Sequence, residues 1–212
     1  MKKLAKRTSV PVLKHGDTVI QGSSRIINYL EEHFPAKPLN FSEQGLNDQA
    51  LEWERFADEQ IGPHVRRIMY HQLLNHPSIV IPIFSHQSPW YSGLYFKIAY
   101  SKLSHMMRKL MQINDEKVEE SKAILNAAFE HLNQTTLINS PPSTEQGYLV
   151  GGRFSRADLS VSALLAPLFL PKAYGINWPD TLPEDLEAVV NQYQPYVRFA
   201  EKNYAQHRTV NN

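Results

Sequence analysis

The sequence predicts a mainly α-helical protein that begins with a small β-β-α unit, an α+β arrangement in which helices dominate. Two short β-branched runs lie on either side of a turn within residues 9–20, and a segment with an apolar face at helical spacing follows them. From residue 42 onward, apolar side chains recur at helical spacing in most segments. We therefore expect three parts: a β-β-α unit at 1–34, a linker at 35–41 and an all-α domain at 42–208.

The β-β-α unit begins with a predicted hairpin. Residues 9–13 and 18–20 have the composition of short strands, and the His15-Gly16-Asp17 stretch between them predicts the turn. Pro11 lies in the first strand and has no backbone N–H. We therefore expect an edge position, a bend or a cis peptide there.

The helix of this unit follows directly. Ser23 or Ser24 can cap its start, Ile26, Ile27, Tyr29 and Leu30 form its apolar face, and it ends before Pro35.

Two features of the unit suit ligand binding. Pro11 places the backbone N–H and C=O of Val10 where they can pair with a ligand peptide instead of a neighbouring strand. The Ser23 hydroxyl and the N–H groups at the start of the helix form an anion site suited to one carboxylate. The alternative for Ser23 is a plain N-cap role.

The helical domain is predicted from its apolar spacing. Its first helix starts near Ser42 and is kinked at Gly62-Pro63, because proline removes one backbone hydrogen bond. Three prolines in residues 76–90 predict a loop, with Ile79-Val80-Ile81 as a buried anchor. Further helices are expected at about 94–110, 115–132, 156–170 and within 183–204, with a polar loop at 133–146.

The segment 91–111 admits two interpretations. Its apolar side chains recur at helical spacing: Tyr95, Ile98, Leu103, Met106, Met107 and Leu110. A Met and Leu stripe of this kind is usually part of a core, and we interpret it so. Binding at a membrane surface is the alternative.

A capping box is predicted at the start of the helix after residue 155. Ser155 can accept a hydrogen bond from the N–H of residue 158, the Asp158 carboxylate can accept from the N–H of Ser155, and Phe154 can pack on Leu159. The helix is unusually apolar with several small residues, which indicates burial on most sides. The motif is therefore structural.

Composition excludes several classes of function. The chain has 212 residues, 22 Lys+Arg and 21 Asp+Glu, so no global field draws it to nucleic acid or an anionic membrane. The absence of cysteine excludes disulfides and thiolate sites. No apolar run approaches a membrane span, and we expect a cytoplasmic protein. The basic N-terminus is interpreted as a solvated end: Lys2, Lys3, Lys6, Arg7 and Lys14.

Aromatic and histidine side chains suggest further sites. The aromatic residues can line an electrophile pocket, although such residues more often form a core or an interface: Trp53, Trp90, Tyr91, Tyr95 and Tyr100. His64, His71 and His76 do not have the spacing of paired metal ligands, and no metal site is predicted.

Together these motifs resemble the glutathione S-transferase superfamily. Val10-Pro11-Val12-Leu13, the hairpin, and then Ser23, Ile26-Ile27 and Tyr29-Leu30 are similar to the glutathione-binding half of its thioredoxin-like domain. Gly152-Arg153-Phe154-Ser155-Arg156-Ala157-Asp158-Leu159 looks like the family's N-capping box, and the segment from Pro195 to Arg208 is similar to the last helix of many members. Asp58 to Pro63 and Arg66-Arg67 further resemble a bacterial branch similar to membrane-associated prostaglandin E synthase type 2.

The resemblance implies a partial thioredoxin-like β-β-α unit followed by an all-α glutathione S-transferase C-terminal-like domain. Glutathione would contact Val10, Pro11, Gln21 and Ser23. Gly22 stands where the family has an acidic residue or Gln. The preceding strand-helix-strand, which supplies the thiol-activating Tyr, Ser or Cys in the family, is expected to be missing, so no catalytic residue is assigned.

The function implied is conjugation of the glutathione thiol to apolar electrophiles, by a homodimer. The alternative is a non-catalytic helical scaffold for binding or dimerisation.

Overall fold

The computed structural model describes residues 10–86, 88–139 and 147–208, and the chain divides into two compact units at residues 1–47 and 48–212. Lys2, Lys3, Lys6 and Arg7 of the predicted solvated end lie outside the described residues. The two units are described in turn.

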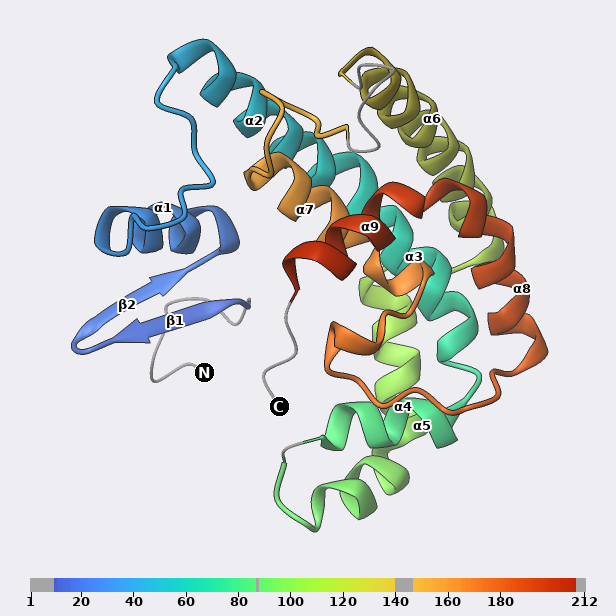
Figure 1. The fold of residues 1–212 in the computed structure, drawn as a ribbon. Helices are drawn as coiled ribbons and strands as arrows, with labels where there is room; N and C mark the ends of the chain where they lie inside the picture. The colour runs from blue at the N-terminus through green and yellow to red at the C-terminus, as the bar shows by residue number, and fades with distance from the viewer. Residues whose placement is uncertain (1–9, 87, 140–146, 209–212) are drawn as a thin grey trace. The chain divides into compact units, whose positions relative to one another are not determined.

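The first unit contains the predicted β-β-α arrangement (Figure 1). Strands β1 (Val12–His15) and β2 (Thr18–Gln21) form an antiparallel hairpin, in which Val12 pairs with Gln21 and His15 pairs with Thr18. Helix α1 (Ser23–His33) follows without a connecting loop. It ends before Pro35, as predicted.

The start of α1 differs from the prediction. Gly22, and neither Ser23 nor Ser24, occupies the N-cap position, and no side chain caps the helix there. Gly22 has φ 98° and ψ 137°, a backbone conformation that side chains disfavour. Glycine is therefore required for β2 to pass directly into α1, and the serines fall in the first turn instead.

The second unit is built around one long helical path. Helix α2 (Gln44–Phe56) continues through a π-helical turn, η1 (Ala57–Ile61), into α3 (Gly62–Leu73). The predicted irregularity at Gly62-Pro63 is thus a π turn that precedes the proline. A Cβ at Gly62 would lie 3.1 Å from Leu164 Cδ2, so glycine permits the close approach of that side chain.

The loop predicted at 76–90 is wrong over most of its length. Residues Pro77–Ser85 form helix α4, which contains Pro82. Pro77 is tolerated because the first helical turn has no intrahelical use for its N–H. Ile79 and Val80 are buried, as the predicted anchor requires, and α4 packs against α5 (Ser92–Leu110). Packing of this apolar segment outweighs the helix-breaking tendency of its prolines.

Helix α6 (Asp115–Asn139) extends beyond its predicted end, so 133–139 are helical and only the remainder of the predicted loop, 140–146, lies outside the described residues. Helix α7 (Arg156–Leu165) is shorter than predicted, because a 3₁₀ turn containing Pro167, η2 (Ala166–Leu168), replaces its last turn. The chain then forms η3 (Lys172–Tyr174), α8 (Glu184–Tyr193), η4 (Gln194–Tyr196) and α9 (Arg198–His207).

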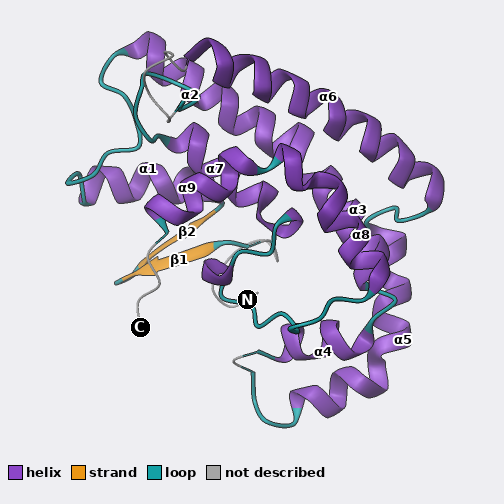
Figure 2. Cartoon of the chain, turned by 45° about the vertical axis from the view of Figure 1, so that its right-hand side comes forward, coloured by secondary structure: helices purple, strands orange, loops and turns teal. Residues whose placement is uncertain are grey.

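The core of the second unit surrounds α7, which packs against α9, α3 and the π-helical turn (Figure 2). Ala157, Val161 and Leu165 on α7 are fully buried. This matches the burial predicted from its apolar composition. None of the described helices is long and apolar enough to cross a membrane.

The apolar stripe of α5 is not core, contrary to our interpretation. No residue of α5 is buried, and four of the six stripe residues are exposed: Tyr95, Ile98, Met106 and Leu110. The other two, Leu103 and Met107, are half-buried and lie on the same side of the helix as Phe96, which contacts Phe84 of α4. Helical spacing alone does not reveal whether a second layer covers the stripe.

Candidate functional site

The candidate site lies where the hairpin edge meets the start of α1. The N–H of Gly22 donates to the carbonyl oxygen of Pro11 at 3.0 Å, which joins the two predicted binding segments. The Val10–Pro11 peptide bond is cis, one of the three possibilities left open by the sequence. Val10 is 71% exposed and Ser23 is also exposed, so both reach solvent at the same end of the hairpin.

The first turn of α1 supplies hydrogen-bond donors to this site. The first N–H groups of a helix have no partner within the helix, and no acidic residue lies in this turn. Gly22 brings no side chain to this position, although its carbonyl oxygen accepts from the N–H of Ile26 at 3.0 Å. The Ser23 hydroxyl is the first side-chain donor of the helix. The chemistry is that of an anion-binding helix start.

Gln21 is the last residue of β2. Side chains alternate between the two faces of a strand, and Ile20 is buried. Half-buried Gln21 therefore points away from the face that Ile20 occupies. It precedes Gly22 directly, so the residue lies next to the start of α1.

A second cluster lies at the turn end of the hairpin. A 2.8 Å hydrogen bond joins His15 Nδ1 to the Tyr29 hydroxyl, and the Tyr29 ring stacks on His33 with centroids 3.9 Å apart. His15 ends β1, whereas Pro11 precedes its start. This phenol therefore lies at the end of the hairpin opposite to Pro11.

The capping box occupies the buried start of α7. The Asp158 carboxylate accepts from the N–H of Ser155 at 2.9 Å, from the Ser155 hydroxyl at 2.8 Å and from the N–H of Leu149 at 2.9 Å. The Ser155 side chain also pairs with the backbone of Asp158, and neither residue has exposed surface. The ring of Phe154 stacks on His207, with centroids 3.9 Å apart. The motif holds α7 in place and offers no surface to a ligand.

Burial raises the pKa of Asp158, while hydrogen bonds from Leu149 and Ser155 act in the opposite direction. Desolvation is the larger effect, because the carboxylate has no contact with solvent.

A buried ion pair next to the capping box was not predicted. Nε and Nη2 of Arg156 both approach Glu54 Oε2 at 2.6 Å, which joins the first residue of α7 to α2. Both side chains are almost completely buried. The sequence signal was an arginine at the start of a helix predicted to be buried, where a charged side chain needs a carboxylate partner.

The predicted aromatic residues do not form one pocket. Trp53 lines a cavity of about 390 Å³ and stacks on His131, with centroids 4.8 Å apart. The Tyr100 hydroxyl donates to the carbonyl oxygen of Leu74 at 3.2 Å. The others are exposed on or beside α5: Trp90, Tyr91 and Tyr95.

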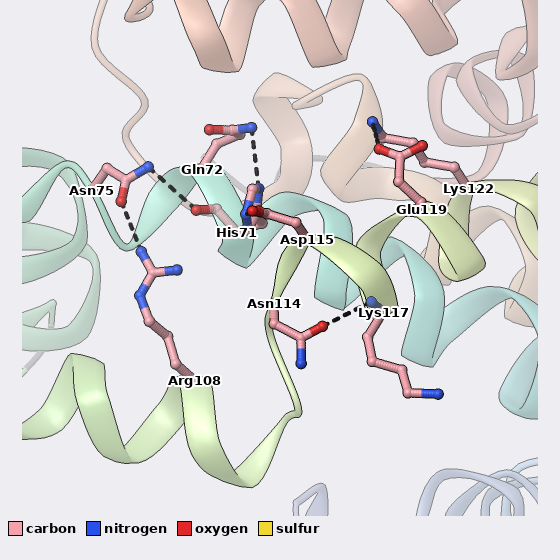
Figure 3. Close-up of polar contacts among 9 residues, drawn as sticks. All are labelled: His71, Gln72, Asn75, Arg108, Asn114, Asp115, Lys117, Glu119 and Lys122. Atoms are coloured by element: carbon pink, nitrogen blue, oxygen red, sulfur yellow. Dashed lines mark hydrogen bonds and ion pairs between the residues drawn. The ribbon is translucent and has the colours of Figure 1, made fainter.

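The histidines singled out by the sequence make pairwise contacts. His71 Nε2 lies 3.0 Å from Asp115 Oδ1, and His76 Nε2 lies 2.7 Å from Asp185 Oδ1 (the first pair is drawn in Figure 3). His64 contacts the buried Ser121 hydroxyl at 3.1 Å. Among the described residues, no group of three potential ligands could hold a metal ion.

Comparison with known proteins gives two findings. Residues 1–38 match a family model described as glutathione S-transferase, N-terminal domain. The structure is similar to the crystal structure of beta-etherase LigF from Sphingobium sp. strain SYK-6, with a TM-score of 0.57 and 20% sequence identity over 97% of this chain and 81% of the other. No curated protein matches the chain. The family match includes both segments of the candidate site, and the structural likeness extends the agreement in fold to the helices.

Proposed function

We propose that this chain belongs to the glutathione S-transferase superfamily and binds glutathione where the starts of β1 and α1 are joined. The observation that carries the proposal is the hydrogen bond from Gly22 to Pro11, which brings Val10 and Ser23 to one end of the hairpin within the segment that matches the family.

The proposed contacts follow from the donors and acceptors available. The backbone N–H and C=O of Val10 pair with the cysteinyl part of glutathione in the manner of an added strand. The Ser23 hydroxyl and the first N–H groups of α1 bind one carboxylate. Gln21, beside the side-chain-free Gly22, supplies the polar contact to the γ-glutamyl end, and Pro11 shapes the bend.

The proposed reaction is conjugation. The sulfur of glutathione attacks the electrophilic carbon of an apolar substrate, the thiol loses its proton, and a leaving group departs or the substrate takes up a proton. Binding lowers the barrier by holding the thiolate in position. We assign no thiol-activating residue. We also propose that the protein works as a cytoplasmic homodimer.

A binding experiment tests the site. Ser23→Ala should weaken glutathione binding roughly tenfold in isothermal titration calorimetry, because a hydrogen bond to a charged group contributes about 1.5 kcal/mol. Ser78→Ala is the matched control, since Ser78 is also an exposed serine in a first helical turn. Its affinity should equal that of the unmodified protein.

Two results would contradict the proposal. One is a failure of the unmodified protein both to bind glutathione and to be retained on glutathione-agarose. The other is an equal effect of the two serine substitutions. Turnover of a chromogenic aryl halide with glutathione then separates conjugation from binding alone.

A non-catalytic scaffold is the second candidate function. The absence of a side chain at Gly22 and the exposed apolar residues of α5 favour it. Glutathione binding without turnover, or binding of a partner by the apolar surface in the absence of glutathione, would support this alternative.

A further inference from the structure

Helices α4 and α5 form a hairpin at one end of the second unit (Figures 1 and 2). Its inner face is apolar, and Phe84 of α4 meets Phe96 of α5 edge to face, with centroids 6.2 Å apart. Its base is fixed by polar contacts. Nη2 of Arg108 donates to Asn75 Oδ1 at 2.7 Å, next to the end of α3 (Figure 3). The hairpin is therefore attached at its base, while the outer face of α5 is left uncovered within the described chain.

The outer face of α5 is apolar in its first half. Trp90, just before the helix, is 93% exposed, and Ile98 is 78% exposed. Tyr91, Leu94 and Tyr95 are exposed beside them. At about 100° per residue, Tyr91, Leu94, Tyr95 and Ile98 fall within an arc of about 100°. These five residues, from Trp90 to Ile98, form what we call the α5 patch.

The second half of the same face is cationic. Lys102 and Lys109 are exposed within the arc that the patch occupies, and Lys97 is exposed beside it. Arg108 and Lys109, together with His105 and Lys117, line an open cavity of about 490 Å³ at the end of the helix. Basic groups therefore follow the patch along α5.

Lys117 is paired with Glu120 at 2.6 Å, but no acidic residue lies near the basic residues of α5 along the chain. From residue 60 to residue 114 the sequence contains six Lys or Arg and no Asp or Glu. The remainder of the chain holds 16 Lys+Arg (22 minus 6) and all 21 Asp+Glu. The near-neutral total therefore conceals a positively charged segment that contains the whole hairpin.

We propose that the α5 face binds the surface of an anionic lipid bilayer. Tryptophan and tyrosine side chains suit the boundary between headgroups and acyl chains, and Leu94 and Ile98 reach just below it. The lysines contact the lipid phosphates, since each basic residue near such a surface adds attraction. The helix lies along the surface and does not cross it.

The charge pattern favours a membrane over a second copy of this chain. A two-fold interface brings the same face of both copies together, so Lys102 and Lys109 would meet either the lysines or the α5 patch of the other copy. Neither offers a carboxylate to pair with them, because α5 contains none. Protein interfaces are also depleted of lysine at their centres. An anionic bilayer offers acyl chains to the apolar half of the face and phosphates to the basic half.

Vesicle flotation tests this proposal. The full chain should float with phosphatidylcholine vesicles that contain about one third phosphatidylglycerol and stay in solution with phosphatidylcholine alone. Raising the salt from about 0.1 M to about 0.5 M should release it, because screening shortens the reach of the lysines. Trp90 emission should shift to the blue on binding, and Trp90→Phe should abolish that shift.

The variants separate the two halves of the face. Leu94→Ser with Ile98→Ser should remove detectable flotation. Lys102→Gln with Lys109→Gln should weaken it about 25-fold, at roughly fivefold per lysine. Tyr196→Ser and Lys172→Glu are controls at an exposed aromatic residue and an exposed lysine elsewhere, and both should bind as the unmodified protein does.

Three outcomes would overturn the proposal. The first is absence of flotation with anionic vesicles. The second is equal loss in the control variants. The third is a dimer in analytical ultracentrifugation that Ile98→Ser dissociates, in a protein that ignores vesicles. The third result would assign the face to a second copy.

Discussion

Helix α7 begins inside the helical unit at a fully buried serine, whereas α1 begins beside an exposed serine at a glycine that has no side chain to offer. The first residue of α7 is Arg156, whose guanidinium forms an ion pair with the carboxylate of Glu54. The first residue of α1 is Ser23, which faces solvent. Both helix starts have N–H groups without a partner in the helix, but only at α7 does a capping box of the chain itself accept from two backbone donors, those of Ser155 and Asp158.

The difference separates a structural motif from a binding motif. A helix start that is buried and capped by its own side chains contributes to stability and is closed to ligands. A start that is exposed and lacks a side-chain cap contributes little to stability and suits an incoming anion. Substitutions at the two helix starts should therefore affect different measurements.

The largest effect is expected at the buried ion pair. Arg156→Met should lower the free energy of unfolding by about 3–5 kcal/mol, because it leaves the Glu54 carboxylate buried without its partner. Urea denaturation measures this loss. Adding Glu54→Met should restore most of it, and a double variant no more stable than the single one would contradict the pairing.

The capping carboxylate should come next. Asp158→Asn preserves shape but replaces one acceptor oxygen by an N–H₂ group, which faces the donors of Ser155 or Leu149. We expect a loss of about 2–3 kcal/mol in the same denaturation experiment. Asp180→Asn, at an exposed position, is the control and should leave stability unchanged. A loss below about 0.5 kcal/mol for Asp158→Asn would contradict the comparison, because the capped helix start would then contribute no more to stability than the uncapped one.

The smallest effect provides the most direct comparison. Ser155→Ala should cost about 1 kcal/mol of unfolding free energy, as for other N-caps, whereas Ser23→Ala should cost less than about 0.5 kcal/mol. Thermal unfolding of both variants compares them. Equal losses would show that Ser23 has a structural role despite its exposure.

The fold was predictable where local chemistry decides the structure. The hairpin follows from the turn signal at Gly16-Asp17, although His15, predicted in the turn, ends β1 and pairs with Thr18. The start of α7 follows from Ser155 and Asp158, whose partners are close in sequence. The joining of Pro11 to Gly22 is likewise a consequence of hairpin register.

The remaining features depend on contacts distant in sequence. The partnership of Arg156 with Glu54 joins residues far apart along the chain, and no local pattern specifies it. Helix α4 forms despite Pro82 because α5 packs on it. The exposure of Ile98 on α5 could not be seen from spacing, since a stripe looks the same whether or not another layer covers it. The absence of acidic residues around it was the signal in the sequence that we missed.

The hydrogen bond between His71 and Asp115 has an architectural consequence. It joins a residue near the end of α3 to the first residue of α6, so the chain departs for the α4–α5 hairpin and returns from it at neighbouring points. The α4–α5 hairpin is therefore an excursion of the chain whose two ends lie side by side on α3 and α6.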